Sequence, residues 1–420
     1  MKVVLINTSE RRGGAAIACN RLAQALGKAG VEARMLVATA DTDSVNGYCT
    51  STWKRLRYKW AFLWERLGIF AQNGFSRNNL FAVSTASDGL DIASHPALRD
   101  ADVIHLHWVN QGFLSLDGLK HILSLGKPVV WTMHDMWAVT GICHHARTCN
   151  NYTEECGNCM FLNSSKKKDL AYRTFNKKRS CYNTAPIHFV TCSAWLRKLA
   201  AKSALIKPSD TVRNIPNPID TSFFCPDDKV AARQALNLPQ DKLLILFGAV
   251  NAADKRKGID YFIETLHTLR KQYGELNDRI ELVVFGNTGN MPLDSMPYPC
   301  TSLGYVSDPE KIRCMYRAVD TYVTPSLEDN LPNTIMEAMA CGTPCVGFEI
   351  GGIPEMIDAQ NGYVARYKDA ADMATGIAKV LHSDNHDTMS KAARQKVLAE
   401  YSEESVAQQY ITLYQSLLSE

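Results

Sequence analysis

Short apolar runs alternate with longer amphipathic segments along most of this chain, which predicts strands separated by helices. In the first half, runs rich in β-branched residues predict strands at Lys2–Asn7, Ala33–Ala38, Val103–His107, Pro128–Met133 and His188–Cys192. The second half repeats the scheme, with predicted strands at Lys242–Gly248, Ile280–Phe285, Thr321–Thr324 and Thr343–Phe348. Helical periodicity predicts helices between them, such as Ala15–Ala29, Ile259–Tyr273 and Lys311–Arg317. Alternation of this kind favours parallel sheets covered by helices.

The length of the chain and a proline-rich stretch near its middle predict two domains. A chain of 420 residues is too long for one hydrophobic core. The stretch Lys207–Pro226 carries four prolines and is typical of a connector: Pro208, Pro216, Pro218 and Pro226. We therefore expect a first domain at 1–216 and a second at 217–400. The helical pattern at Ser402–Leu418 has no following strand, so residues 401–420 are predicted to return to the first domain.

Composition narrows the class of protein. Hydrophobic residues make up 46% and charged residues 21%, which is ordinary for a soluble globular protein. There is no apolar run of about 18 residues, and the apolar stretch at the N-terminus is too short for a signal peptide. Thirteen cysteines without an export signal favour a reducing compartment. We expect a cytoplasmic protein, and a net charge of +3 says little about its partners.

The segment Thr324–Glu355 carries the most specific chemistry. Asn333 follows Pro332 and is the predicted start of a helix, which leaves backbone N–H groups from Leu331 to Thr334 for an anion such as phosphate. Glu337 lies one turn further in, where its carboxylate can accept hydrogen bonds from a hydroxylated group. Asp329 on the preceding loop can hold a second polyol, so the arrangement suits a nucleotide sugar. The alternative is an ordinary helix with a polar first turn.

Other candidate residues follow strands of the first half. Gly13 and Gly14 come after the first strand and open a helix, where glycine allows close approach to phosphate or sugar. His134 ends the strand Val129–Met133, and the carboxyl ends of parallel strands face the ligand in doubly wound domains. His105 and His107 alternate on one strand and so share a face. For all three histidines a structural role is the alternative.

The residue order around Glu337 resembles glycosyltransferase family 4, whose signature is Glu, seven residues, Glu, then Ala-Met-Ala-Cys-Gly-x-Pro-Val. Here Asp329 stands in the place of the first Glu, and Glu328 is an alternative. Further matches occur in order along the chain: Gly-Gly-Ala from Gly13, the His134 position, the Pro-Asn hinge at Asn217, and Lys257–Gly258. The NLPNT-IMEAMACGTPCV form, HDMW and a cysteine cluster resemble enzymes of bacterial exopolysaccharide and O-antigen assembly.

The resemblance implies a fold and roles for particular residues. The fold is GT-B: two facing Rossmann-like α/β domains with a cleft between them and a C-terminal helix crossing back. The activity is transfer of a hexosyl group from a nucleoside-diphosphate sugar to a glycan or polyprenyl-diphosphate-linked acceptor, with retained configuration and no cofactor required for catalysis. Catalytic roles fall to His134, Lys257, Asp329 and Glu337. Donor or diphosphate contacts fall to Gly13, Gly14, Arg256, Asn330, Leu331, Asn333 and Thr334. Independently of the resemblance, the shared face of His105 and His107 and the place of Asp135 after His134 lead us to expect roles on the acceptor side, or in support of residues that touch the ligand. Ala249 replaces an expected Arg, and Lys255 or Arg256 is expected to supply that charge.

Four cysteines between positions 143 and 159 form the cluster: Cys143, Cys149, Cys156 and Cys159. Four thiols with a CxxC spacing can hold tetrahedral zinc, and unligated thiols or reversible disulfides are the alternative. We expect at most a structural zinc here.

A basic aromatic segment and a lysine-rich segment lie in the first half. Leu56, Trp60, Leu63 and Leu67 fall on one helical face among several Lys and Arg residues, and a second basic stretch begins at Lys166. They suit an anionic membrane surface, with the protein peripheral on its inner face, or a lipid-diphosphate acceptor. A core-packing helix with a solvated basic face is the alternative. No nucleic-acid module is recognisable. A nucleotide-sugar epimerase, or a non-catalytic sugar- or lipid-binding partner, are the rival functions.

Overall fold

The computed structural model describes residues 1–43, 45–251, 254–289, 293–382, 384 and 386–419, without the side chains of 249–251 and 294. The chain separates into two compact units. Unit 1 contains Met1–Pro218 and Val406–Glu420, and unit 2 contains Ile219–Ser405. Within the described residues, no helix combines the length and the apolar character that a membrane crossing requires.

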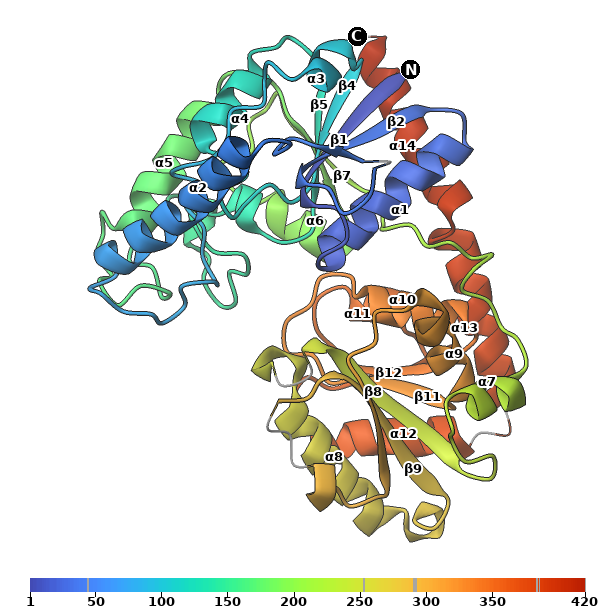
Figure 1. Cartoon of the computed structure of the whole chain (residues 1–420). Coiled ribbons are helices and arrows are strands. Elements are labelled where there is room, and N and C mark those ends of the chain that lie inside the picture. The colour runs from blue at the N-terminus through green and yellow to red at the C-terminus, as the bar shows by residue number, and fades with distance from the viewer. Residues whose placement is uncertain (44, 252–253, 290–292, 383, 385, 420) are drawn as a thin grey trace. The chain divides into compact units, whose positions relative to one another are not determined.

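Unit 1 is built on a parallel sheet of seven described strands in the order β3-β2-β1-β4-β5-β6-β7 (Figure 1). The strands are β1 (Lys2–Ser9), β2 (Glu32–Thr39), β3 (Asn46–Gly47), β4 (Val103–Leu106), β5 (Val129–Met133), β6 (His188–Thr191) and β7 (Thr211–Asn214). The helices are α1 (Gly14–Lys28), α2 (Thr52–Gln72), α3 (Pro96–Asp100), α4 (Leu116–Leu123), α5 (Leu170–Tyr182), α6 (Ala194–Ala200) and α14 (Glu403–Leu418). Because β1 neighbours both β2 and β4, the strand order reverses between β1 and β4, where doubly wound sheets bind ligands.

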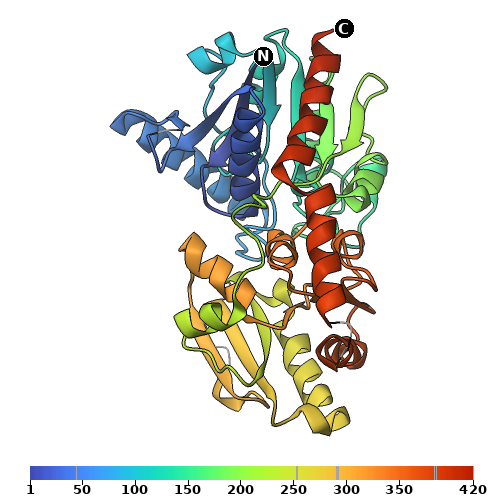
Figure 2. The same ribbon diagram turned by 90° about the vertical axis from the view of Figure 1, so that its right-hand side faces the viewer.

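Two hydrophobic layers cover this sheet. Alternate residues of β1 point to opposite faces, so Val3 and Leu5 pack with α1 and α14, while Val4 and Ile6 pack on the side of α3, α4 and α5. Figure 2 shows α14 running along the sheet of unit 1. The prediction that the C-terminal helix returns to the first domain is confirmed, because Val406, Tyr410 and Tyr414 belong to the same buried cluster as α1.

Unit 2 repeats the scheme with six described parallel strands in the order β10-β9-β8-β11-β12-β13. The strands are β8 (Leu243–Asn251), β9 (Ile280–Asn287), β10 (Cys300–Gly304), β11 (Thr321–Thr324), β12 (Cys345–Phe348) and β13 (Gly362–Ala365). The helices are α7 (Lys229–Ala235), α8 (Ile259–Gln272), α9 (Pro309–Ala318), α10 (Asn333–Ala340), α11 (Ile353–Met356), α12 (Ala370–His382) and α13 (His386–Glu400). Helices α8 and α12 cover one face, and α9, α10 and α13 lie on the other (Figure 1). The strand order reverses between β8 and β11.

The predicted connector is only partly a connector. Thr211–Asn214 forms β7 and adds an edge strand to the sheet of unit 1, pairing with β6. The division between the units follows at Pro218, after this strand. Asp220 then accepts hydrogen bonds from the N–H groups of Ser222 and Phe223 at 2.9 and 3.0 Å, as expected of a capping residue.

Candidate functional site

Three loops meet where the strand order of unit 2 reverses. They follow the carboxyl ends of β8, β11 and β12. Gly258, after β8, has a φ of +74°, and a Cβ there would lie 1.9 Å from the carbonyl oxygen of Pro325 on the loop after β11. Only glycine allows that approach. The N–H of Leu327 donates to the carbonyl of Arg256 at 2.7 Å and fastens the same two loops together.

The loop after β12 packs against the loop after β11. Gly351 has a φ of +60°, and a Cβ there would lie 1.7 Å from the carbonyl oxygen of Asp329. The N–H of Gly352 donates to the carbonyl of Asn330 at 2.8 Å. The Gly351–Gly352 loop therefore packs directly against the loop that carries Asp329 and fixes its backbone.

The charged side chains of this region form two ion pairs. Lys257 Nζ lies 2.7 Å from Asp329 Oδ2, and both side chains are partly exposed. Arg256 pairs with Asp254 at 2.7 Å. Burial alone would lower the pKa of Arg256, but the hydrogen bond and charge of Asp254, with Glu328 and Asp329 nearby, raise it. The structure thus brings Lys257 and Asp329 together, while Arg256 is held by a neighbour that the sequence did not single out. The side chain of Ala249 lies outside the described set.

Helix α10 begins at Asn333, as predicted, with Pro332 as its N-cap. Pro332 makes no side-chain cap hydrogen bond, and the positive end of the helix directly follows the loop that carries Asp329. Glu337 lies one turn in and is 8% exposed. Tyr316 on α9 donates to its Oε2 at 3.2 Å. Burial, and then the charge of Glu337, raises the pKa of the Tyr316 hydroxyl, which therefore stays a donor. Tyr316 carries no sequence signal that identifies this role.

The remaining donor-side candidates surround that helix end. Asn330 and Leu331 are buried on the loop, and the N–H of Asn330 donates to Asp329 Oδ1 at 3.1 Å. The side chain of Thr334 hydrogen-bonds the buried hydroxyl of Tyr322. Tyr322 donates in turn to the carbonyl of Gly248 on β8, at 3.2 Å. The first turn of α10 is thereby tied to the strand that precedes the Lys257 loop.

In unit 1, the glycine pair begins α1 at the point of strand reversal. Gly13 has a φ of +93° and stands as the N-cap, without a side-chain cap among the described residues. Glu10 in the preceding loop is fully buried and accepts the N–H groups of Asp41 and Thr42 at 2.7 and 3.0 Å. The loop is therefore anchored to the end of β2, and Gly14 opens the helix as predicted.

Three histidines cluster at the ends of β4 and β5. His107 Nδ1 lies 3.0 Å from His134 Nε2, so one ring must donate and the other accept. Burial lowers the pKa of His134 to about 4, against a smaller opposing effect of Asp135. Burial, with the neighbouring histidines, also lowers the pKa of His107. Both rings are therefore neutral near pH 7 and can exchange hydrogen bonds. Among the described residues, His107 Nε2 is buried without a partner.

For His105 the structure favours the structural alternative over direct contact with an acceptor. The residue is 0% exposed, and both ring nitrogens are used inside the core. Its Nε2 lies 2.7 Å from Thr132 Oγ1, and its Nδ1 lies 2.7 Å from the hydroxyl of Tyr414 on α14. Tyr410 bonds the same Thr132 at 2.8 Å. His105 therefore holds α14 against the sheet, which is the structural alternative.

Asp135 is also occupied by structural contacts. Its Oδ2 accepts the Nε1–H of Trp108 at 2.9 Å and lies 2.7 Å from His144 Nδ1, and its Oδ1 accepts the N–H of Trp137 at 2.8 Å. Burial alone would raise the pKa of Asp135, but the charge and hydrogen bond of His144 and the Trp137 N–H hold it below its usual range. The carboxylate fixes the segment after His134 and has little capacity left for an acceptor.

The cysteine cluster is buried beside an unusual lysine. Burial raises the pKa of Cys143, Cys156 and Cys159 to about 12, so these thiols are protonated. Lys178 Nζ lies among them, donates to the carbonyls of Trp137 and Thr140, and sits 3.5 Å from the Trp137 ring centroid. Across the described residues no three His, Cys, Asp or Glu side chains are placed to hold a metal ion, so the structure gives the predicted zinc site no support.

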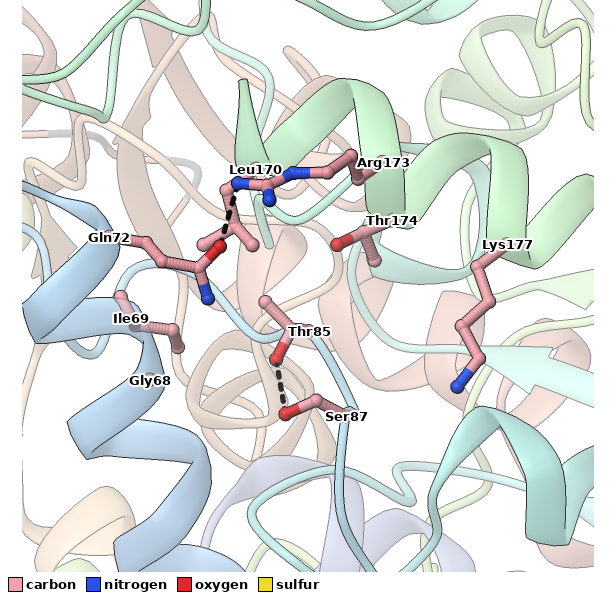
Figure 3. A pocket seen from close by; sticks show the side chains of 9 residues that line it. All are labelled: Gly68, Ile69, Gln72, Thr85, Ser87, Leu170, Arg173, Thr174 and Lys177. Carbon is pink, nitrogen blue, oxygen red and sulfur yellow. Dashed lines mark hydrogen bonds between the residues drawn. The ribbon is translucent and has the colours of Figure 1, made fainter. Parts of the chain in front are cut away.

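A cavity of about 130 Å³ lies between α2 and α5 in unit 1 (Figure 3). Its lining includes Gln72 from α2 and Arg173 and Lys177 from α5, and Arg173 donates to Gln72 Oε1 at 2.7 Å. None of the residues with a predicted catalytic or donor role lines it. The cavity is therefore separate from the donor-side residues of unit 2 and from the glycine pair and histidines of unit 1.

Two doubly wound parallel-sheet domains, the second with an acidic helix start beside a Lys-Gly loop, define a glycosyltransferase of the GT-B fold. The family model "Glycosyltransferase Family 4" matches residues 12–223, and "Glycosyl transferases group 1" matches residues 241–383. The chain belongs to glycosyltransferase family 4, as its motifs predicted.

Among relatives, the putative colanic acid biosynthesis glycosyl transferase WcaC of Escherichia coli is 22% identical over 352 residues, covering 81% of this chain and 80% of that protein. Sucrose-phosphate synthase from Thermosynechococcus elongatus superposes with a TM-score of 0.67 at 18% identity, over 100% of this chain and 99% of that one. Anabaena HepE, solved with UDP and glucose, has a TM-score of 0.60 at 14% identity, over 99% and 100%. At these identities the two structures support the fold alone.

Proposed function

We propose that this glycosyltransferase moves a hexosyl group from a nucleoside-diphosphate sugar to a glycan or polyprenyl-diphosphate-linked acceptor, in the assembly of a bacterial surface polysaccharide. The observation that carries the donor assignment is the uncapped start of α10 beside the Lys257–Asp329 pair, with Glu337 buried one turn further in. The relative named for colanic acid biosynthesis agrees with a role in assembling a surface polysaccharide, and a neighbour of the same fold was solved with UDP and glucose.

Each group has a task that follows from its chemistry. The positive end of α10 and the ammonium of Lys257 suit the charge that builds up on a departing diphosphate. Glu337, held by Tyr316, accepts hydrogen bonds from the hydroxyls of a ribose. Asp329 is bound to Lys257 in the free protein and is positioned to turn to the hydroxyls of the donor sugar.

The proposed transfer retains configuration by attack on the face that the diphosphate leaves. The bond from the anomeric carbon to the phosphate oxygen breaks, the bond from that carbon to the acceptor oxygen forms, and the leaving diphosphate takes the acceptor's proton. His134 is neutral near pH 7, and to hydrogen-bond the donor sugar it would exchange its contact with His107 at 3.0 Å or with Cys192 Sγ at 3.5 Å. The diphosphate keeps the electron pair, so atoms and charge balance without a further reactant.

The donor assignment is tested by calorimetric titration with UDP, GDP, ADP and CMP. We expect one nucleotide to bind, and Glu337→Gln to weaken it about 10- to 100-fold, because a hydrogen bond to a charged group contributes about 1.5–3 kcal/mol. The matched control is Glu264→Gln, an exposed position on α8 of the same unit, which should bind like the wild type. Folded wild-type protein that binds none of the four, or equal affinities in the two variants, would contradict the assignment.

Catalysis and stereochemistry need a separate measurement. With the nucleotide identified, hydrolysis of its sugar conjugate is followed by NMR, which also reports the configuration of the released sugar. We expect retention, and a loss of turnover in Lys257→Ala that exceeds its loss of nucleotide affinity, because the diphosphate charge grows in the transition state. Inversion would refute the proposed front-face transfer.

A further inference from the structure

Helix α2 presents an apolar face to solvent. Its exposed side chains recur at helical spacing, three of them tryptophans at 75%, 54% and 62% exposure and three of them leucines at 46% each. We call them the α2 stripe: Trp53, Leu56, Trp60, Leu63, Trp64 and Leu67. Single exposed apolar residues are ordinary on protein surfaces, but a contiguous row of six along one helix face marks an interaction surface.

The orientation of the helix is fixed by charged residues on its inner face. Glu65 is 0% exposed and accepts hydrogen bonds from the hydroxyl of Ser84 and the N–H groups of Thr85 and Ala86 at 2.6–2.8 Å. Its other oxygen pairs with buried Arg66 at 2.8 Å. Turning the stripe inward would break this network and would also expose Ala61 and Ile69, which are buried on the inner face of α2. The contacts of Glu65 therefore hold the stripe toward solvent, and the core-packing alternative for this helix is wrong.

Cations lie at the flank and the end of the stripe. Lys59 is an exposed residue of α2 itself. Lys166, Lys167 and Lys168 are exposed on a loop that is tied to the C-terminal end of the helix. Two bonds make that tie: the N–H of Asn163 donates to Asn73 Oδ1 at 2.6 Å, and Ser164 donates to the carbonyl of Gln72. The loop that bears the lysine cluster is thus fastened to the C-terminal end of α2 by hydrogen bonds.

We propose that the α2 stripe docks into the surface of an anionic phospholipid bilayer, with the lysine cluster against the lipid head groups. A helix that is apolar on its outer face, rich in tryptophan and flanked by cations lies in the plane of the interface, where indole rings are partly buried and partly hydrated. Since α2 is too polar on its inner face to cross a bilayer, the contact is peripheral. The cations at the flank and end of the stripe are complementary in charge to anionic head groups, and for this reason we assign the stripe to a bilayer rather than to a second copy of this chain. The proposal does not depend on the identity of the donor.

The test is flotation of the full-length protein with vesicles of phosphatidylcholine alone or with 30% phosphatidylglycerol. We expect binding to the anionic vesicles and a blue shift of tryptophan emission, because three of the chain's seven tryptophans are in the stripe. Leu63→Glu should weaken binding at least tenfold. Leu398→Glu is the matched control, a leucine of 43% exposure on α13 of unit 2, and should bind like the wild type. Both positions are exposed, so both variants are expected to fold.

The lysine cluster is tested separately by replacing Lys166, Lys167 and Lys168 with Gln. We expect about a fivefold loss of binding for each lysine on anionic vesicles, and little change on neutral ones. Three outcomes would overturn the proposal: no vesicle binding by the wild type, equal binding by Leu63→Glu and Leu398→Glu, or a stable dimer in solution that Leu63→Glu dissociates while vesicles do not bind. The last of these would assign the stripe to a second copy of the chain.

Discussion

Mild acid should destabilise unit 1, because its buried histidines resist protonation. Burial lowers the pKa of His105 to about 3 and that of His134 to about 4, whereas a histidine in the unfolded chain titrates near 6.5. As the pH falls below 6.5, these histidines become protonated in the unfolded chain but stay neutral in the folded protein. The unfolded state then binds more protons, so the free energy of unfolding falls with pH until the folded-state pKa values are reached.

The size of the effect follows from those values. Between pH 7 and pH 5, each histidine removes up to about 1.8 kcal/mol of stability, so the two together remove about 4 kcal/mol. His107, whose pKa is also lowered by burial, adds to the loss. For a domain with a typical stability of about 5–15 kcal/mol, this is a large fraction.

Tryptophan fluorescence during urea unfolding measures this loss in unit 1 alone, because all seven tryptophans lie in that unit. In His134→Asn the loss between pH 7 and pH 5 should be smaller by about 2 kcal/mol, since one suppressed titration is removed. His121→Asn, at an exposed site of the same unit, should keep the wild-type slope. Equal stability of the wild type at both pH values would contradict the proposed effect of histidine burial. So would a loss in His134→Asn as large as in His121→Asn and the wild type.

Two further substitutions test particular contacts. Gly258→Ala should destabilise unit 2 by about 2 kcal/mol or more and abolish activity, because its Cβ would collide with the carbonyl of Pro325. Gly274→Ala should do neither, because the new methyl group meets open space and the residue has no positive φ. Calorimetric unfolding compares the two variants. Lys178→Met should cost about 2–4 kcal/mol, because it leaves two buried carbonyls without their donor. Lys177→Met at its exposed neighbour should cost less than about 1 kcal/mol, and comparable losses in urea unfolding would refute the role of the buried Lys178 side chain.

The strands that the sequence predicted and those it missed differ in their place in the sheet. Every strand with a predicted range lies in the interior of one of the two sheets. The strands without a prediction are the edge strands β3 and β7 in unit 1 and β10 and β13 in unit 2. Interior strands of parallel sheets are covered on both faces and so appear as continuous apolar runs. Edge strands are short and partly exposed, as TVRN of β7 and CTSLG of β10 show, and they lack that signal.

For two features, periodicity gave the element and left its environment undetermined. The spacing of Leu56, Trp60 and Leu63 predicted the helix α2, but a helical stripe fits a core and an exposed docking face equally well. What decides is the buried Glu65, whose partners lie on the loop at residues 84–86. His105 is the same case, because its partner Tyr414 comes from α14 at the far end of the chain. Contacts between distant segments carry no local signature.

In the donor-side group, the sequence motif identified Lys257, Asp329 and Glu337 individually, but not the contact between the first two. Lys257 and Asp329 lie on loops after different strands, and neither residue type is rare on a surface loop, so their pairing could not be read from either loop alone. The glycines beside them are required by the backbone: a side chain at Gly258 or at Gly351 would strike the carbonyl of the neighbouring loop. A motif that combines such glycines with charged residues therefore indicates that two loops approach each other closely. That close approach also brings Lys257 and Asp329 together.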